Sequence, residues 1–159
     1  MTRIDPALPE LPIRSSAWRE LVASGVKVVI HDSHSTRGGG FWHPDTQLVE
    51  LFTAQEEAAI HEIAHAWWEE LRRDETTRRQ FLAAVLRLSE EVDPRFRDAA
   101  SLAHVYEHGD PSTGFPGMGD SDWERYAGLA SGVMGRLERL PNYVARFYAG
   151  LFDLPKVRS

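Results

Sequence analysis

Cysteine is absent from this chain of 159 residues. Its absence excludes a disulfide framework and every zinc site built on thiolates, so a metal bound here must be held by His, Asp or Glu. Long apolar runs are absent too, and no segment approaches the roughly 20 residues that a transmembrane helix needs. The sequence therefore predicts a protein with no membrane partner.

The N-terminus lacks the apolar segment of a signal peptide, because Asp5, Glu10 and three prolines interrupt it. We therefore expect a cytoplasmic protein. A net charge of −6 gives no reason to expect a nucleic acid or an anionic membrane as partner. With 42% hydrophobic and 26% charged residues the composition is that of a soluble globular protein. The length predicts one domain over residues 1–159 with a hydrophobic core.

One motif stands out, His61-Glu62-Ile63-Ala64-His65. On a helix the two histidines lie on one face about one turn apart, where both imidazoles can reach a single cation. The glutamate lies toward the open side of that metal, where it can take a proton from a bound water and pass it to a leaving amine. This H-E-x-x-H arrangement predicts a zinc site for peptide hydrolysis. The alternative is a helix whose histidines lie on a solvated face by chance.

The residues around the motif predict a helix with a buried stripe. Thr53-Ala54-Gln55-Glu56 has the form of a capping box, so the helix should begin near Ala54. Apolar residues then recur at helical spacing and leave the two histidines and the motif glutamate at the border of the stripe. The stripe consists of Ile60, Ile63, Ala64, Trp67 and Leu71.

The residues before this helix predict a small sheet. A short helix and a β-branched strand come first, and two strand-like segments then flank a proline-containing turn, which indicates a β-hairpin. These elements are an extended arm at residues 1–14, a helix at 15–24, a strand at 26–30, and hairpin strands at 40–43 and 47–51.

After residue 72 the pattern predicts helices to the end of the chain. The predicted helices span residues 76–92, 93–108 and 122–139 and a last segment from 143, with a glycine-rich loop at 109–121. The fold class is therefore α+β, with a small N-terminal sheet followed by a mostly helical remainder. The residues expected to be largely buried are Ile60, Ile63, Trp67, Leu71, Phe81, Val85 and Phe147.

A catalytic zinc normally needs a third protein ligand in addition to two histidines. Trp68 and Leu71 exclude the variant of the motif that continues with a glycine and a third histidine. The third ligand must therefore come from farther along the chain. The candidates are His104, His108, Asp120, Asp122 and Glu124.

Glu124 is the favoured third ligand, because it lies in the first turn of a helix with a stripe of small residues. Such a stripe lets two helices approach closely, as metal bonds near 2 Å from ligands on different helices require. The alternative is that Glu124 completes a capping box with Ser121, which would aim its carboxylate at its own backbone. The stripe consists of Gly128, Ser131, Gly132 and Gly135.

The strand, the glycine-led hairpin, the helix with His61-Glu62-x-x-His65 and the later Glu124-x-x-Ala127 resemble the minimal zincin metallopeptidases. They are most similar to the branch whose third ligand is a glutamate, which includes domains similar to the anthrax lethal factor protease. The resemblance covers about residues 26–72 and 121–152.

The resemblance implies a zincin-like fold, Zn²⁺ as cofactor and a peptide or protein as substrate. By this likeness His61, His65 and Glu124 would be the metal ligands and Glu62 the general base. In that family the outer strand of the hairpin binds the substrate as an added β-strand, which would put Gln47–Leu51 along the cleft.

Zincins of that branch often carry a tyrosine shortly before the glutamate ligand, where it stabilises the oxyanion. The loop at residues 109–122 has none, so Tyr106 or His108 would have to substitute. This departure keeps two alternatives open. One is a zincin-fold module that binds a peptide or protein with weak or no proteolysis, and the other is a helical interaction module in which the motif is incidental.

Overall fold

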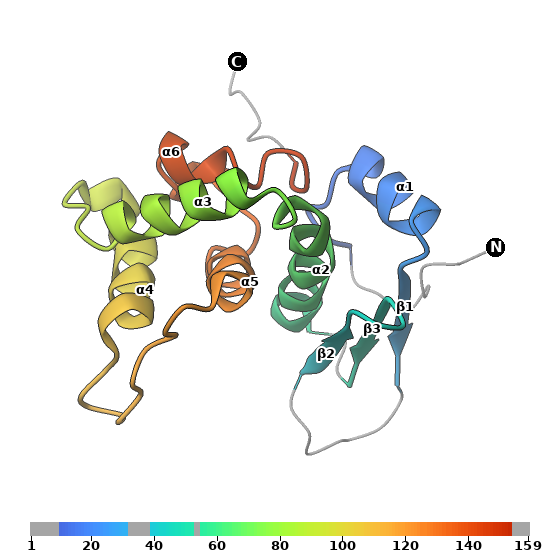
Figure 1. The fold of residues 1–159 in the computed structure, drawn as a ribbon, viewed down its shortest axis with the longest axis horizontal. Coiled ribbons are helices and arrows are strands. Elements are labelled where there is room, and N and C mark those ends of the chain that lie inside the picture. Colours follow the sequence, from blue (N-terminus) through green and yellow to red (C-terminus); the bar gives the residue numbers. More distant parts are fainter. Residues whose placement is uncertain (1–9, 32–38, 53–54, 154–159) are drawn as a thin grey trace.

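A computed structural model describes residues 10–31, 39–52 and 55–153 and shows an α+β fold (Figure 1). The helices are α1 (Ser15–Ala23), α2 (Glu56–Leu71), α3 (Glu75–Leu88), α4 (Arg97–His108), α5 (Asp122–Gly132) and α6 (Asn142–Ala145), with 3₁₀ turns at Pro94–Phe96 and Leu137–Arg139. The strands are β1 (Lys27–Ile30), β2 (Gly40–His43) and β3 (Leu48–Leu51). The predicted class, a small N-terminal sheet followed by helices, is confirmed.

The sheet has the strand order β1-β3-β2, with β1 parallel and β2 antiparallel to β3. The predicted hairpin is confirmed, and Gln47 takes a positive φ of 54° where its turn enters β3. One expectation is wrong. Gln47–Leu51 cannot be the outer strand, because β3 is hydrogen-bonded on both sides. Among the described residues β2 has a free edge instead.

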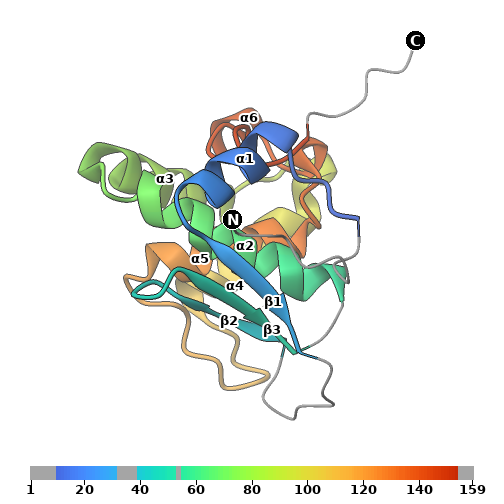
Figure 2. The same cartoon turned by 90° about the vertical axis from the view of Figure 1, so that its right-hand side faces the viewer.

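The position of α2 explains which residues form the core. The sheet packs against one side of α2 and α5 against the other, as the two cartoon views show (Figures 1 and 2). Helix α4 lies on the far side of α5, and α3 packs against α4, α5 and α6. A helix enclosed on two sides buries more than one stripe, and α2 accordingly buries Ile60 and Ile63 toward the core together with Glu62 and His65.

Five of the seven predicted core residues are buried, namely Ile60, Ile63, Phe81, Val85 and Phe147. Trp67 and Leu71 are only partly buried. The fully buried indole is that of Trp68, which stacks on Tyr126 of α5 at a ring-centroid distance of 4.5 Å. The stripe prediction is one residue too early at this end of α2, because Trp68 packs against Phe81 of α3 and Tyr126 of α5.

Several predicted boundaries are wrong. Helix α2 begins at Glu56, its N-cap Gln55 makes no side-chain capping bond, and the predicted cap Thr53 lies outside the described residues. Helix α3 ends at Leu88. Helix α5 ends at Gly132, seven residues early, because Met134 and Gly135 adopt positive φ angles of 54° and 68° that no α-helix continues through. The last predicted helix is confined to the four residues of α6.

The ends of the described chain pack together. Most of the predicted extended arm lies outside the described residues, but Ile13 is buried and forms an isolated β-bridge with Phe152.

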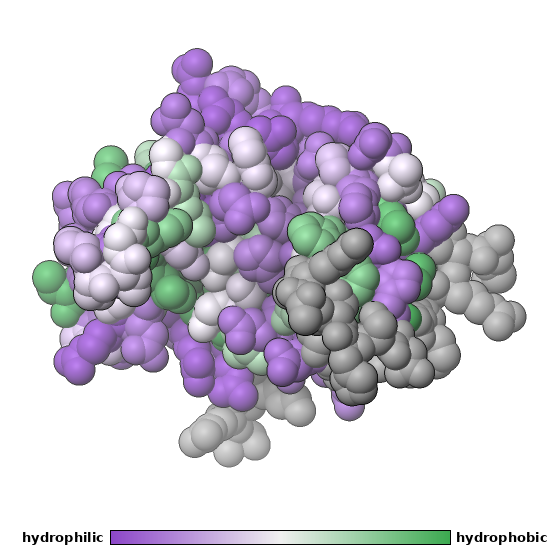
Figure 3. All heavy atoms as spheres, turned by 90° about the horizontal axis from the view of Figure 1, so that it is seen from below, coloured by the Kyte–Doolittle hydropathy of each residue, from purple (hydrophilic) through white to green (hydrophobic). Residues whose placement is uncertain are grey.

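None of the helices in the described ranges has the length and apolarity to cross a membrane. Seen from below, the visible described residues are mostly hydrophilic, and apolar ones lie in separate patches (Figure 3).

Candidate metal centre

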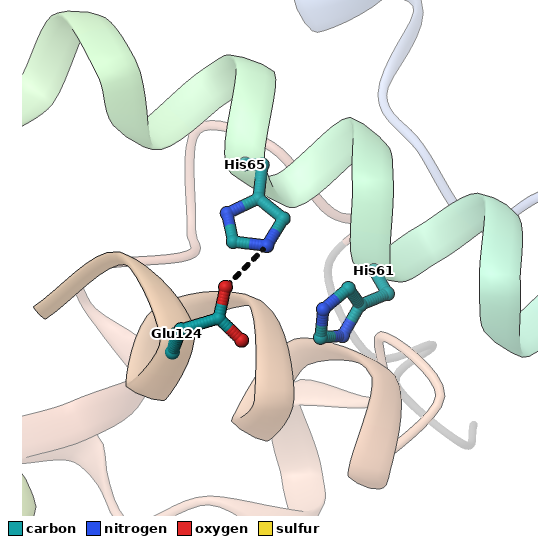
Figure 4. A group of neighbouring side chains, drawn as sticks. All are labelled: His61, His65 and Glu124. Atoms are coloured by element: carbon teal, nitrogen blue, oxygen red, sulfur yellow. Dashed lines mark ion pairs between the residues drawn. The ribbon is translucent and has the colours of Figure 1, made fainter. Parts of the chain in front are cut away.

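Three side chains converge between the middle of α2 and the first turn of α5. One possible ligand atom from each of His61, His65 and Glu124 lies within 4.8 Å of the others. The two imidazoles come from successive turns of α2, and the carboxylate rises from the first turn of α5 to meet them (Figure 4). The Nε2 atom of His65 lies 3.3 Å from Oε1 of Glu124. The spacing of the motif predicted the pair of histidines, and the stripe of small residues after Glu124 favoured this carboxylate as their partner.

The capping contacts at the start of α5 determine which way the Glu124 carboxylate points. Ser121 caps the helix as predicted, because its Oγ accepts from the Glu124 backbone N–H at 3.2 Å. The reciprocal half of a capping box is missing, since the Ser121 N–H donates to the Met118 carbonyl instead. The carboxylate of Glu124 therefore faces His65. The hydrogen bond that it accepts from His65 lowers the pKa of Glu124.

Asp122 fixes α5 to α2 two residues before Glu124. Its carboxylate accepts from Nε1 of Trp68 at 2.7 Å and from Nε and Nη2 of Arg72 at 2.8 and 3.2 Å. Burial alone would raise the pKa of Asp122, but the hydrogen bonds from Arg72 and Trp68 outweigh it and the pKa lies below its usual value. These bonds occupy the carboxylate, so Asp122, one of the third-ligand candidates, does not join the cluster.

The small residues of α5 contact two neighbouring helices, α2 and α4. A Cβ atom at Gly128 would lie 2.6 Å from the hydroxyl of Tyr106, and one at Gly132 would collide with Leu102. Both of those residues belong to α4, so these glycines allow the close approach of α4 and not of α2, contrary to our expectation. Ser131 is the member of the stripe that faces α2.

The contact with Ser131 determines the tautomer of His61, and burial determines its protonation state. Its hydroxyl lies 3.2 Å from Nδ1 of His61 and donates to the Ala127 carbonyl at 3.1 Å. Since a hydroxyl has one proton, its oxygen accepts from the Nδ1–H of His61, and the Nε2 lone pair stays free. Burial, aided by the neighbouring His65, lowers the pKa of His61 to about 4. The imidazole is therefore neutral at pH 7, which is the form that binds metals.

Glu62 lies beside the cluster and under β2. Its side chain is buried, and Oε1 lies 3.9 Å from Nε2 of His61. A Cβ atom at Gly40 would lie 3.1 Å from Cγ of Glu62 and 2.6 Å from the Glu50 carbonyl, so only glycine fits between Glu62 and β3. Burial raises the pKa of Glu62 more than the nearby His65 lowers it.

Two cavities flank the cluster. A cleft of about 500 Å³ lies on the side of the α2 C-terminus, and a smaller cavity of about 360 Å³ lies on the side of its N-terminus. Gly40, His61 and Glu62 line both, so the cluster sits between them beside β2. The remaining walls of the larger cleft are Phe41, Trp42, Pro44, His65, Glu69, Arg72, Trp123 and Glu124.

The residues predicted as substitutes for the missing tyrosine lie elsewhere. Tyr106 packs against Gly128 and lines neither cavity, and burial, then Glu124 and Glu57, raises its pKa to about 12. His108 is exposed at the end of α4 and packs against His104, with ring centroids 4.7 Å apart. Neither His104, His108 nor the exposed Asp120 is brought to the cluster.

The sequence analysis missed the functions of Ser131 and Gly40 at the site. Ser131 lies seven residues after Glu124, which is two helical turns on the same face, so this spacing was a usable signal. The contact of Gly40 with Glu62 had no local signal, because it depends on how the sheet packs over α2.

Two imidazoles and one carboxylate form the N,O donor set that suits Zn²⁺, with a fourth tetrahedral position left for a water or a substrate. The hydrogen bond from His61 to Ser131 is the kind of supporting contact that metal-binding histidines make. The described residues therefore fit a catalytic rather than a closed structural zinc site. In comparisons with known proteins, no protein-family model, no curated protein and no solved structure matches this chain.

Proposed function

We propose that this chain is a zinc-dependent metallopeptidase with a zincin-like arrangement of sheet, metal-bearing helix and glutamate ligand. The observation that carries the proposal is the convergence of His61, His65 and Glu124 within 4.8 Å, beside the buried carboxylate of Glu62. A chance H-E-x-x-H string gives no reason for a carboxylate 59 residues beyond His65 to face the same histidines, as Glu124 does.

In this mechanism His61, His65 and Glu124 hold the metal, and Ser131 orients the first imidazole. Bound Zn²⁺ would lower the pKa of a coordinated water and polarise the scissile carbonyl. Glu62, next to the ligands but not one of them, accepts the proton of the attacking water and delivers it to the leaving amine. Its contact with Gly40 limits the positions that this carboxylate can take.

The free edge of β2 provides the place for the substrate backbone. Gly40, Phe41 and Trp42 line the larger cleft, and among the described residues their strand pairs with β3 alone. A substrate in an extended conformation would add to this edge by main-chain hydrogen bonds, which hold a peptide regardless of its side chains. Such a peptide passes directly over Glu62 and the metal ligands.

A second candidate function is peptide binding without cleavage. It is favoured by one observation, that no tyrosine lines either cavity at the cluster within the described residues. Without such a donor the metal alone would stabilise the oxyanion, and cleavage would be slow. The metallopeptidase and the binding module would use the same site, and only the metallopeptidase would cleave the bound peptide.

Cleavage of a peptide library distinguishes the two. We expect the zinc-loaded protein to cut a subset of peptides, and activity to vanish with a zinc chelator and return on addition of zinc. Glu62→Gln should keep zinc and fold but lose turnover by at least about 100-fold, because an amide accepts no proton from the water. Glu90→Gln, an exposed carboxylate just beyond α3, is the matched control and should cut normally.

Each result excludes one of the candidates. Cleavage that survives both the chelator and Glu62→Gln would refute the metallopeptidase, because the activity would then come from another group or a contaminant. Zinc-dependent peptide binding with no cleavage of any library member would favour the binding module.

A further inference from the structure

A third cavity, of about 400 Å³, adjoins the proposed catalytic cleft. It lies between the end of α1, the turn of the hairpin and the C-terminal half of α2. Trp42, Pro44 and Glu69 line both this cavity and the cleft, so a side chain projecting from a peptide in the cleft can enter it. Its other walls are Glu20, Leu21, Ser24, Val26, Asp45, Gln47, Ala66, Trp67, Glu70 and Arg73.

Glu69 lies at the junction of this cavity and the catalytic cleft, and no ion pair holds it among the described residues. Its partly buried side chain accepts from Nε1 of Trp42 at the long distance of 3.5 Å. No Lys, Arg or His among the described residues comes within ion-pair distance of it, although Arg72 and Arg73 follow closely in the same helix. Arg72 forms its ion pair with Asp122 and Arg73 with Glu70, so neither forms one with Glu69. The charge of Glu69 still acts on Arg72 at longer range and helps to raise the pKa of that guanidinium.

Two indole rings form the apolar walls beside this carboxylate. Trp42 comes from the hairpin and Trp67 from α2, and both are partly buried. A guanidinium or ammonium group packs well on an indole face. The molecule shows this contact once already in the catalytic cleft, where the guanidinium of Arg72 lies 5.1 Å from the ring centre of Trp123. Trp42 and Trp67 have no such cation among the described residues.

A carboxylate beside two indole rings favours one class of side chain, a long basic one. A Lys or Arg side chain would lay its methylene stem on the indoles and bring its charge to Glu69. The charged walls of the cavity are four carboxylates and one cation, namely Glu20, Asp45, Glu69, Glu70 and Arg73. An acidic side chain would therefore be repelled by this excess of negative charge, and a purely apolar one would cover Glu69 without a partner, at a cost in desolvation.

We propose that this cavity, with Glu69 as its recognition residue, selects peptide substrates that carry Lys or Arg near the scissile bond. The inference rests on the proposed peptidase function for its catalytic consequence. The recognition of the basic side chain itself needs no turnover, and this difference allows the two proposals to be tested separately.

The test uses peptides that share one backbone sequence and differ at single positions, where Lys, Arg, Leu or Glu is placed. We expect the zinc-loaded protein to prefer Lys or Arg at one position by about tenfold or more in kcat/KM. Glu69→Gln keeps the size of the side chain and removes its charge, so it should abolish this preference, and the kcat/KM ratio of the Lys peptide to the Leu peptide should fall to about one. Glu138→Gln, an exposed carboxylate in the second 3₁₀ turn, should retain the preference.

Binding to a protein that cannot turn over gives the second readout. Fluorescent Lys and Glu peptides are titrated into zinc-loaded Glu62→Gln and into the double variant Glu62→Gln/Glu69→Gln. We expect tighter binding of the Lys peptide to the single variant, and equal binding of both peptides to the double variant. Thermal melts check that both variants fold.

The outcomes separate the two proposals. Cleavage without preference for a basic residue, or a preference that Glu69→Gln retains, would overturn the cavity assignment and leave the peptidase intact. No cleavage, with Glu69-dependent binding of the Lys peptide, would overturn the peptidase and support the cavity. Neither cleavage nor selective binding would overturn both.

Discussion

The contact of Asp122 with α2 predicts a large effect from replacing one buried carboxylate. Asp122→Asn keeps an acceptor for Trp68 but removes the charge that holds Arg72, and the new amide N–H₂ faces the guanidinium. Breaking a fully buried ion pair costs about 3–5 kcal/mol. The side chain of Arg72 is 31% exposed and can be partly hydrated once released, so we expect about 2–3 kcal/mol of lost stability.

The stability difference should depend on pH with a defined sign. The folded state lowers the pKa of Asp122 below its unfolded value of about 3.9, so the ionised carboxylate stabilises the fold. This stabilisation is complete above the unfolded pKa and is lost as the pH falls through the folded one. The free energies of unfolding of wild type and Asp122→Asn should therefore differ at pH 7 and converge below about pH 4.

Urea unfolding measures this difference, with Asp120→Asn as the matched control. Asp120 is exposed two residues earlier and should change stability by less than about 0.5 kcal/mol. Because Asp122 holds the first turn of α5 against α2, we also expect its replacement to weaken zinc binding about tenfold through Glu124. A loss below about 0.5 kcal/mol at pH 7, or one that grows toward low pH, would refute the assigned contact.

Two further substitutions test how the site is supported. Ser131→Ala removes the acceptor of the His61 Nδ1–H and should lower zinc affinity about tenfold, with little change in the thermal melt. Competition with a chromogenic chelator measures the affinity. An unchanged affinity would mean that this contact does not orient the imidazole. Gly40→Ala puts a Cβ atom 2.6 Å from the Glu50 carbonyl and 3.1 Å from Glu62, and should cost about 1–3 kcal/mol and lower kcat more than it lowers zinc content. A Gly40→Ala protein with normal stability and turnover would show that Glu62 does not need this space.

The sheet, the hairpin and the helix of the motif were predictable because their signals are local. Alternating β-branched residues, a proline turn and a 3.6-residue period each act over a few neighbours. The pairing of His61 and His65 follows from the same period. Glu124 was predicted to join this pair because small residues on α5 were expected to face α2. Glu124 does lie beside the two histidines, but Gly128 and Gly132 face α4 instead.

The remaining errors come from tertiary contacts. Trp68 replaces Trp67 in the core because α5 covers one side of α2, which no pattern within α2 reveals. The strand order could not be read from the sequence, because the parallel pairing of β1 with β3 moves β2 to the edge. Helix α5 ends early because the chain turns through Met134 and Gly135 to pack against Phe152, seventeen residues farther along.

A zinc-edge anomalous difference map from crystals grown with one equivalent of zinc tests the central claim most directly. The account predicts one dominant peak, about 2.0–2.2 Å from Nε2 of His61, Nε2 of His65 and the carboxylate of Glu124. No peak at these atoms, or a dominant peak at the exposed His104 and His108 with this cluster empty, would contradict it.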